Sequence, residues 1–201
     1  MIRRSLFGLI LCLLMAAPVA AQETTQDTTP APVRVALDTS AGLIVLEMDP
    51  RAPVTVANFL RYVDEGRLDG VSFYRALDMG APGGLIQGGT NGDPARVLPP
   101  IAHEPTSQTG LSHVEGTISM ARFDPGTATG DFFIILGPGL TSLDASARDP
   151  VGFAAFGRVT QGLDIARAIL TAPRSPTAGE GDMVGQMLEP KIEIRTARRV
   201  E

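Results

Sequence analysis

Runs of β-forming residues in this chain are short, and long loops rich in glycine and proline separate them. The sequence holds 22 glycines and 16 prolines among 201 residues. Both residue types interrupt regular elements, so the chain favours many short strands over a few long ones. The predicted strands are residues 33–38, 43–48, 71–74, 85–87, 116–121, 132–136, 153–159 and 192–196.

The first two of these strands have the features of a hairpin. Val33, Val35 and Leu37 alternate with other residues, which is the period of a strand with one buried face. The turn between the strands, residues 39–42, is short and ends in glycine. Alternation joined by such a turn predicts an antiparallel pair.

Two helices are predicted, one near each end of the folded part. Pro53 opens the first, where its missing N–H costs nothing, and Gly66 stops it. The apolar residues of this helix recur at helical spacing and are Val56, Phe59, Leu60 and Val63. The second helix covers residues 163–170, and its predicted inward residues are Ile165, Ala168 and Ile169. Short strands with a helix near either end indicate a mainly β protein, a barrel with helices over its openings.

The first 21 residues have the parts of a secretory signal. Two arginines precede an apolar run at residues 6–15, and small residues follow at 16–21. This pattern predicts cleavage after Ala21. The alternative is a membrane anchor that is never cut, but the run is shorter than the roughly 20 apolar residues that a span needs.

Cys12 is the only cysteine, and it lies inside that apolar run. Leu11 precedes it where a lipoprotein has a small residue, so lipid attachment is disfavoured. After cleavage no cysteine remains, and an exported domain without disulfides must be held by its own core.

Residues 22–32 are polar, rich in threonine and end in prolines, which predicts a flexible tether. Residues 33–201 contain no internal repeat and no second linker, so we expect one domain there. The protein is predicted to be periplasmic or secreted and monomeric. Contact with a membrane is expected only through an uncleaved signal.

The charge and the polar residues exclude several functions. The formal charge is −5, and loss of Arg3 and Arg4 with the signal makes it −7, which argues against nucleic acid as a partner. His103 and His113 lie beside Glu104 and Glu115, but this spacing does not define four metal ligands. The serines lack the Gly-x-Ser-x-Gly setting of a hydrolase. Neither a metal nor a cofactor is therefore expected.

Three short segments carry the remaining chemistry. Residues 73–77 supply Arg75, residues 85–89 supply Gln87, and residues 130–136 supply a pair of phenylalanines. Few reactions need only a fixed cation, an amide and an apolar pocket. Rotation about a prolyl peptide bond is one of them, because its barrier of about 18–20 kcal/mol comes from amide resonance and no proton needs to move.

The order of motifs resembles the cyclophilin family of peptidyl-prolyl isomerases. The matching segments are APVTVANFLRYVDEG (52–66), FYR (73–75), IQGG (86–89), GTISMAR (116–122), FFI (132–134), SLD (142–144) and FGRV (156–159). The resemblance implies a closed eight-stranded antiparallel barrel capped by two α-helices. It also implies isomerase activity, without a cofactor, on unfolded or extended polypeptides that contain proline.

The resemblance assigns roles residue by residue. Arg75 takes the place of the family's catalytic arginine, and Gln87 that of the glutamine that orients it. The residues expected to bind substrate are Leu85, Met120, Ala121, Arg122, Asp131, Phe133, Leu143 and Phe153. Alternation along residues 132–136 puts the two phenylalanines on opposite faces, so we expect one in the core and one in the groove.

The chain also departs from the family pattern, chiefly around the proline pocket. About four extra residues lie between Arg75 and Gln87, in the loop at 79–84. The positions that differ from the usual family residue are Tyr74 (histidine), Gly84 (phenylalanine), Leu85 (methionine), Asp131 (glutamine), Ser142 (often tryptophan) and Phe153 (histidine). These changes predict weak activity and, through Ser142, poor cyclosporin binding. Two alternatives stay open: a binding module without turnover, and a chaperone that holds unfolded chains.

Overall fold

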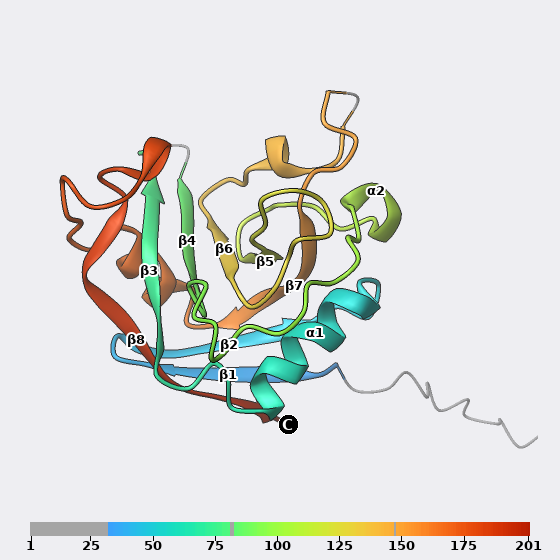
Figure 1. The fold of residues 1–201 in the computed structure, drawn as a ribbon, viewed down its shortest axis with the longest axis horizontal. Coiled ribbons are helices and arrows are strands. Elements are labelled where there is room, and N and C mark those ends of the chain that lie inside the picture. The colour runs from blue at the N-terminus through green and yellow to red at the C-terminus, as the bar shows by residue number, and fades with distance from the viewer. Residues whose placement is uncertain (1–31, 81–82, 147) are drawn as a thin grey trace, which may run out of the picture. The chain divides into compact units, whose positions relative to one another are not determined.

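The computed structural model describes residues 32–80, 83–146 and 148–201 (Figure 1). The predicted signal, residues 1–21, and all of the predicted tether except Pro32 lie outside the described residues. Among the described residues, no helix is long and apolar enough to cross a bilayer.

Eight antiparallel strands close into a barrel, which confirms the predicted fold class. The strands are β1 (Arg34–Thr39), β2 (Gly42–Met48), β3 (Val71–Asp78), β4 (Gly84–Gly89), β5 (Thr117–Met120), β6 (Phe132–Leu136), β7 (Ala154–Gln161) and β8 (Met187–Val200). Their order around the barrel is β1-β2-β7-β5-β6-β4-β3-β8. The first hairpin forms as expected, with Thr39 paired to Gly42.

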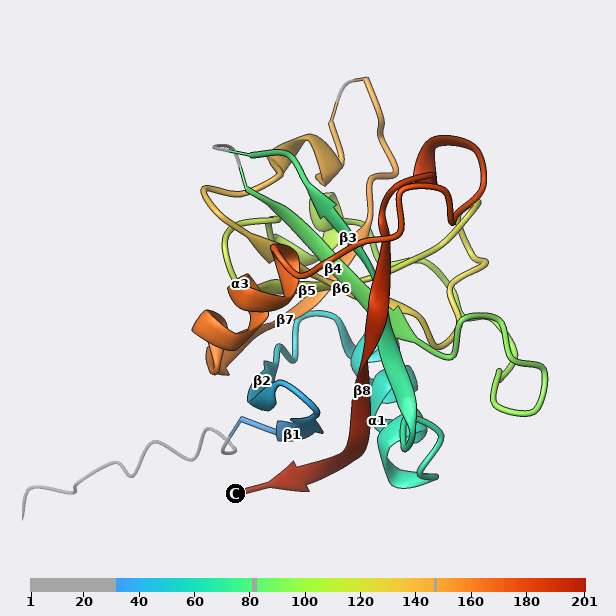
Figure 2. The same cartoon turned by 90° about the vertical axis from the view of Figure 1, so that its left-hand side faces the viewer.

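Two main helices pack on the strands, as predicted. Helix α1 (Pro53–Asp64) contacts β7 and β8, and α3 (Leu163–Leu170) contacts β2, β3, β4 and β6 (Figures 1 and 2). Three shorter elements were not expected: α2 (Thr106–Thr109) and two single 3₁₀ turns, η1 (Thr141–Leu143) and η2 (Gly181–Met183).

The buried face of α3 differs from the prediction. Ala168 is exposed and Ile165 is only partly buried, whereas Ala166, Ile169 and Leu170 are buried. Residues 165, 168 and 169 have the same helical spacing as 166, 169 and 170, so periodicity alone could not choose between the two stripes. Leu170 packs beside Gly84 of β4, and Ile165 packs beside Gly42 of β2 from the edge of the buried face.

Aromatic rings fill the barrel interior. Phe132 of β6 meets Phe59 of α1 edge-on, with ring centroids 5.3 Å apart, and meets Phe73 of β3 at 5.7 Å. Phe59 also contacts Phe156 of β7 at 5.2 Å. Edge-to-face pairs add about 0.5–1.5 kcal/mol each to the burial of the rings. This cluster fixes α1 and three strands to one another.

The buried carboxylate of Glu104 caps α1 from a distant loop. It accepts hydrogen bonds from the backbone N–H of Val54 at 3.1 Å, and from the N–H and hydroxyl of Thr55 at 2.7 Å each. Free N–H groups and the positive end of the helix dipole both favour a carboxylate there. The acidic residue beside His103 therefore has a structural role.

A bulge in β3 decides which side chains leave the barrel. Phe73 pairs with Gly88 of β4 and Arg75 pairs with Gln87, so the ladder skips Tyr74. Strict alternation would put Arg75 on the same face as buried Phe73. The extra residue instead turns Tyr74 and Arg75 to the same outer side, which is a recognised use of bulges beside active sites.

Gly88 makes this bulge possible. A Cβ atom at Gly88 would lie 2.9 Å from both the Phe73 ring and the Ser72 carbonyl oxygen. Any side chain there would push β3 and β4 apart. The glycine after Gln87 therefore serves the bulge.

Candidate active site

Arg75 is held at the barrel surface by two glutamines. Its Nη1 donates to Oε1 of Gln87, directly opposite on β4, at 2.8 Å. Its Nε donates to Oε1 of Gln186, also at 2.8 Å. Partial burial lowers the pKa of Arg75, but a guanidinium keeps its charge at neutral pH. The side chain is thus a cation whose direction is fixed from two sides.

Gln186 did not figure in the sequence prediction. It lies just before β8, where its Nε2 donates to the carbonyl of Asp182 at 2.5 Å and its own carbonyl accepts from the N–H of Ala76. Ala76 is the next residue after Arg75, so the β3–β8 pairing itself brings Gln186 to the guanidinium. Gln186 lies 111 positions from Arg75, and no sequence signal marks it.

A polar chain continues from Gln87 to Asp131. Nε2 of Gln87 donates to the Tyr74 hydroxyl at 2.7 Å. The carboxylate of Asp131 lies near this hydroxyl and accepts the N–H of Asn91 at 2.7 Å. Burial raises the pKa of both Tyr74 and Asp131. Asp131 is partly buried, and one of its oxygens accepts the N–H of Asn91. Its predicted part in substrate binding stays a prediction.

An apolar cluster lies outside the barrel wall. Its buried members are Leu85, Phe133 and Ile135. The partly buried residues packed against them are Leu77, Ala121, Leu140, Leu143 and Phe153. Phe133 and Phe153 meet edge-on with centroids 5.6 Å apart. Five of the residues predicted to bind substrate thus come together in one cluster.

Alternation along β6 puts Phe132 inside the barrel and Phe133 in this outer cluster, as predicted. Phe133 pairs with Gln87 across β4 and β6. Because Gln87 in turn pairs with Arg75, adjacent strands place the cation, the amide and the ring next to one another. Strand register therefore brings these three groups together.

His113 lies against Phe133 of the apolar cluster. Its ring stacks on Phe133 with centroids 6.0 Å apart, and it is fully buried. Nδ1 lies 2.5 Å from Asp144 and Nε2 lies 2.9 Å from the hydroxyl of Ser119. Burial lowers the pKa of His113, although Asp144 opposes this.

Ser119, His113 and Asp144 are hydrogen-bonded in the same series as the serine, histidine and aspartate of a serine hydrolase. Ser119, however, is fully buried in β5 and faces no open space that a substrate could enter. The three residues act as a hydrogen-bonded support for Phe133. Within the described residues, no three His, Cys, Asp or Glu side chains gather as a metal ion would need.

The two remaining predicted residues have different positions. Arg122 stacks on the Phe153 ring at 4.6 Å and donates to the carbonyls of Phe123 and Gly152, so it borders the cluster. The side chain of Met120 is 1% exposed and belongs to the barrel core. The structure therefore does not bring the Met120 side chain to the groove, and only its backbone could contact a peptide.

Gly84 has no room for the ring that the family pattern places there. A Cβ atom would lie 1.9 Å from the carbonyl oxygen of Leu77. Leu77 itself belongs to the outer cluster and lies two positions after Arg75, on the same face. Leu77 therefore adds apolar surface to this cluster. The spacing i, i+2 from Arg75 could have found it.

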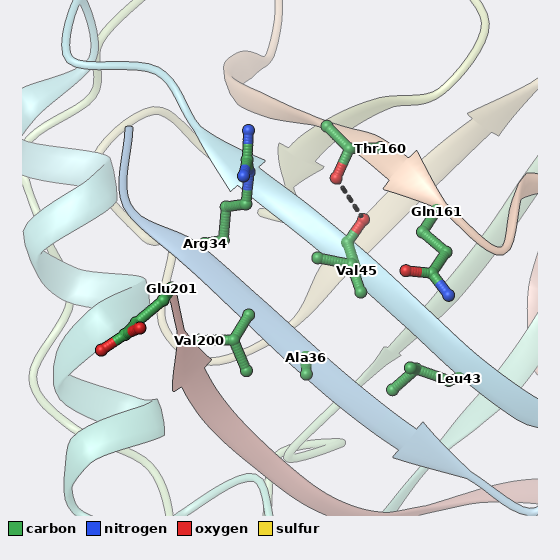
Figure 3. Close-up of a pocket in the computed structure, with 8 residues that line it drawn as sticks. All are labelled: Arg34, Ala36, Leu43, Val45, Thr160, Gln161, Val200 and Glu201. Atoms are coloured by element: carbon green, nitrogen blue, oxygen red, sulfur yellow. Dashed lines mark hydrogen bonds between the residues drawn. The ribbon is translucent and has the colours of Figure 1, made fainter. Parts of the chain in front are cut away.

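A hollow elsewhere on the barrel wall is unrelated to these residues (Figure 3). It has a volume of about 480 Å³ and lies over β1 and β2, where the Thr160 hydroxyl donates to the Val45 carbonyl at 3.3 Å. Arg34 and Val200 also line it. None of the residues that the sequence predicted for the site is among its walls.

Comparison with known proteins now identifies the family. A family model described as cyclophilin type peptidyl-prolyl cis-trans isomerase/CLD matches residues 34–197. The chain is also 39% identical over 156 residues to peptidyl-prolyl cis-trans isomerase cyp18 of Streptomyces antibioticus, covering 74% of this chain and 90% of the relative. This chain belongs to the cyclophilin family.

Further relatives agree. Peptidyl-prolyl cis-trans isomerase A of Dickeya dadantii is 39% identical over 140 residues, covering 67% of this cyclophilin and 70% of the relative. Two crystal structures of a Cryptosporidium parvum cyclophilin share the fold at 20% identity, with TM-scores of 0.65 and 0.66. The matches cover 85% and 84% of this chain, and 98% and 99% of the two Cryptosporidium chains. The second structure was solved in the presence of the dipeptide Ala-Pro. The predicted isomerase function is confirmed at family level, and the roles of individual residues stay predictions.

Proposed function

We propose that this cyclophilin accelerates X-Pro rotation by directing the Arg75 guanidinium at the prolyl nitrogen of a bound polypeptide. In the twisted transition state that nitrogen loses conjugation, becomes pyramidal and can accept a hydrogen bond. A guanidinium only donates, so it stabilises this nitrogen more than the planar ground state. The observation that carries the proposal is the clamped cation at the edge of the Phe133 cluster.

The apolar cluster complements the cation. Phe133, Leu85 and Leu143 would hold the prolyl ring while the preceding carbonyl turns, because an apolar surface retains the ring without fixing the carbonyl. A preorganised donor of this kind is worth about 3–4 kcal/mol in the transition state. No proton transfer is required, so the activity needs no titrating group.

The substrates that we propose are exported polypeptides in unfolded or extended form, bound by a monomer in the periplasm or outside the cell. The signal-like first 21 residues support export. Solution of a related structure with Ala-Pro supports a proline-containing ligand. Cell fractionation and the N-terminal sequence of the exported protein test this part. Retention in the cytoplasm with Met1 intact would contradict it.

The mechanism is tested by Arg75→Ala and Arg75→Lys, assayed on a prolyl tetrapeptide with a coupled protease. We expect Arg75→Ala to lower kcat/KM at least about a hundredfold, and Lys to recover little, because it lacks the planar fork. Arg61→Ala, which removes an exposed ion pair on α1, is the matched control. A variant that kept most of its activity would remove Arg75 from the mechanism.

A peptide titration run beside this assay separates turnover from capture. If Arg75→Ala binds the peptide as well as wild type but no longer turns it over, the guanidinium acts on the transition state. If wild type binds without turnover, the protein is a binding module. Suppression of aggregation that survives Arg75→Ala would indicate a separate holding function.

A further inference from the structure

The amide of Gln87 works in only one of its two orientations. A guanidinium has donors and no acceptor, so Gln87 must present oxygen to Arg75 and NH₂ to the other side. An amide flipped by a half turn would place donors against donors. The 2.8 Å bond from Nη1 to Oε1 therefore depends on whatever receives the NH₂ group.

The Tyr74 hydroxyl receives it. Its oxygen lies 2.7 Å from Nε2 of Gln87. A hydroxyl that accepts there can direct its own proton elsewhere, and the nearby carboxylate of Asp131 is a suitable acceptor, since an ionised carboxylate only accepts. The directions of both bonds of the Gln87 amide are then determined, because the guanidinium only donates and the Tyr74 oxygen accepts.

The surroundings of Tyr74 and Asp131 hold both side chains in place. Tyr74 is 7% exposed and is the bulge residue that the β3–β4 ladder skips, so its side chain is turned outward by the strand itself. Asp131 is tied to the loop after β4 by the N–H of Asn91. Gly89 permits this close approach, because a Cβ atom there would lie 2.7 Å from Oδ1 of Asp131.

We propose that Tyr74 is a positioning residue for isomerisation, whose hydroxyl locks the Gln87 amide in the orientation that aims Arg75. This inference rests on the proposed function of Arg75 and adds the group that acts through Gln87. Asp131 serves the same purpose one step further away, by taking the hydroxyl proton so that the oxygen stays available to Gln87.

The test is Tyr74→Phe, which removes one hydroxyl and keeps the ring. We expect kcat/KM to fall about three- to tenfold, chiefly through kcat, because one hydrogen bond that orients the catalytic cation is lost. In a Gln87→Ala background the same change should have no further effect, since Tyr74 acts through that amide. In a Gln87→Glu background it should also be silent, because a carboxylate presents oxygen at both ends.

Tyr62→Phe is the matched control, because Tyr62 is the only other tyrosine. Its hydroxyl accepts the N–H of Leu98 at 2.7 Å, and among the described residues it makes no hydrogen bond to Arg75 or Gln87. This variant should lose stability and keep kcat/KM per folded molecule. An equal loss of activity in both variants would show a general structural effect and overturn the proposal.

A measurement without substrate separates the proposal from the proposed function. Side-chain NMR of the free protein reports rotation of the Arg75 guanidinium. This rotation should be slow in wild type and in Tyr62→Phe, which gives separate Nη proton signals. In Tyr74→Phe it should be fast, which averages these signals into one. Unchanged Nη signals in Tyr74→Phe, or additive losses of activity in the Gln87→Ala background, would overturn the role of Tyr74. A different outcome is averaged Nη signals in Tyr74→Phe together with full activity in Arg75→Ala. That outcome would refute the proposed mechanism but leave the positioning role of Tyr74 intact.

Discussion

Phe132 and Phe133 are neighbours in sequence, yet they serve opposite sides of the barrel wall. Phe132 packs between Phe59 and Phe73 in the interior, whereas Phe133 lies between His113 and Phe153 on the outside. One strand thus carries both the core of the fold and the floor of the candidate proline pocket.

A matched pair of substitutions separates these two roles. Phe132→Leu should lower the free energy of unfolding by about 1–3 kcal/mol, because two edge-to-face contacts are lost. Phe133→Leu should cost less stability but raise KM for a prolyl peptide several-fold. Denaturant unfolding and steady-state kinetics on both variants measure the difference. A larger KM effect from Phe132→Leu would contradict the assignment.

Gln186→Ala should reduce kcat with little change in stability. It removes the bond to Nε of Arg75, and hydrogen bonds to charged groups are worth about 1.5–3 kcal/mol, so we expect a loss of about tenfold or more. Gln161→Ala, at the exposed end of β7, is the control. Full activity in Gln186→Ala would mean that Gln87 alone suffices to hold the guanidinium.

The stability of the protein should fall as the pH is lowered below about 6.5, the unfolded pKa of histidine. Burial lowers the pKa of His113 in the folded state, so the unfolded chain binds more protons as the pH falls. Acidification therefore stabilises the unfolded state relative to the folded state. For Asp144, burial alone would raise the pKa, but hydrogen bonds from Ser112 and His113 lower it overall. Its contribution is therefore present above about pH 4 and lost as the pH falls further.

Urea unfolding at several pH values checks the histidine window. The slope of unfolding free energy between about pH 7 and 5 should be shallower in His113→Asn than in wild type, whatever the stability of the variant. An unchanged slope would assign the pH dependence to other groups.

Glu104→Ala should lower the free energy of unfolding by about 1–3 kcal/mol, because the N–H groups of Val54 and Thr55 lose their buried acceptor. Glu189→Ala, on the exposed part of β8, should change it little. Thermal unfolding measures both. A Glu104→Ala variant as stable as the control would show that water replaces the carboxylate.

The barrel, its two main helices and the joint placement of Arg75, Gln87 and Phe133 could be predicted from the order of short motifs. Gln186 could not, because its contact arises from pairing of β3 with β8 across the length of the domain. His113 lies in a loop, and nothing in its sequence neighbours indicates that it is buried there against the partly exposed Asp144. For α3 two apolar stripes fit the spacing, and the choice between them depends on packing against the barrel strands.

Tyr74 shows how strongly the site depends on the number of residues in β3. Side chains on a strand take alternate sides, so the outward aim of the cation rests on one supernumerary residue in β3. Deleting that residue would keep Arg75, Gln87 and Phe133 in the chain and still send the positive charge toward the aromatic interior. Relatives whose segments differ in length at this point should therefore be compared by parity of residues as well as by identity.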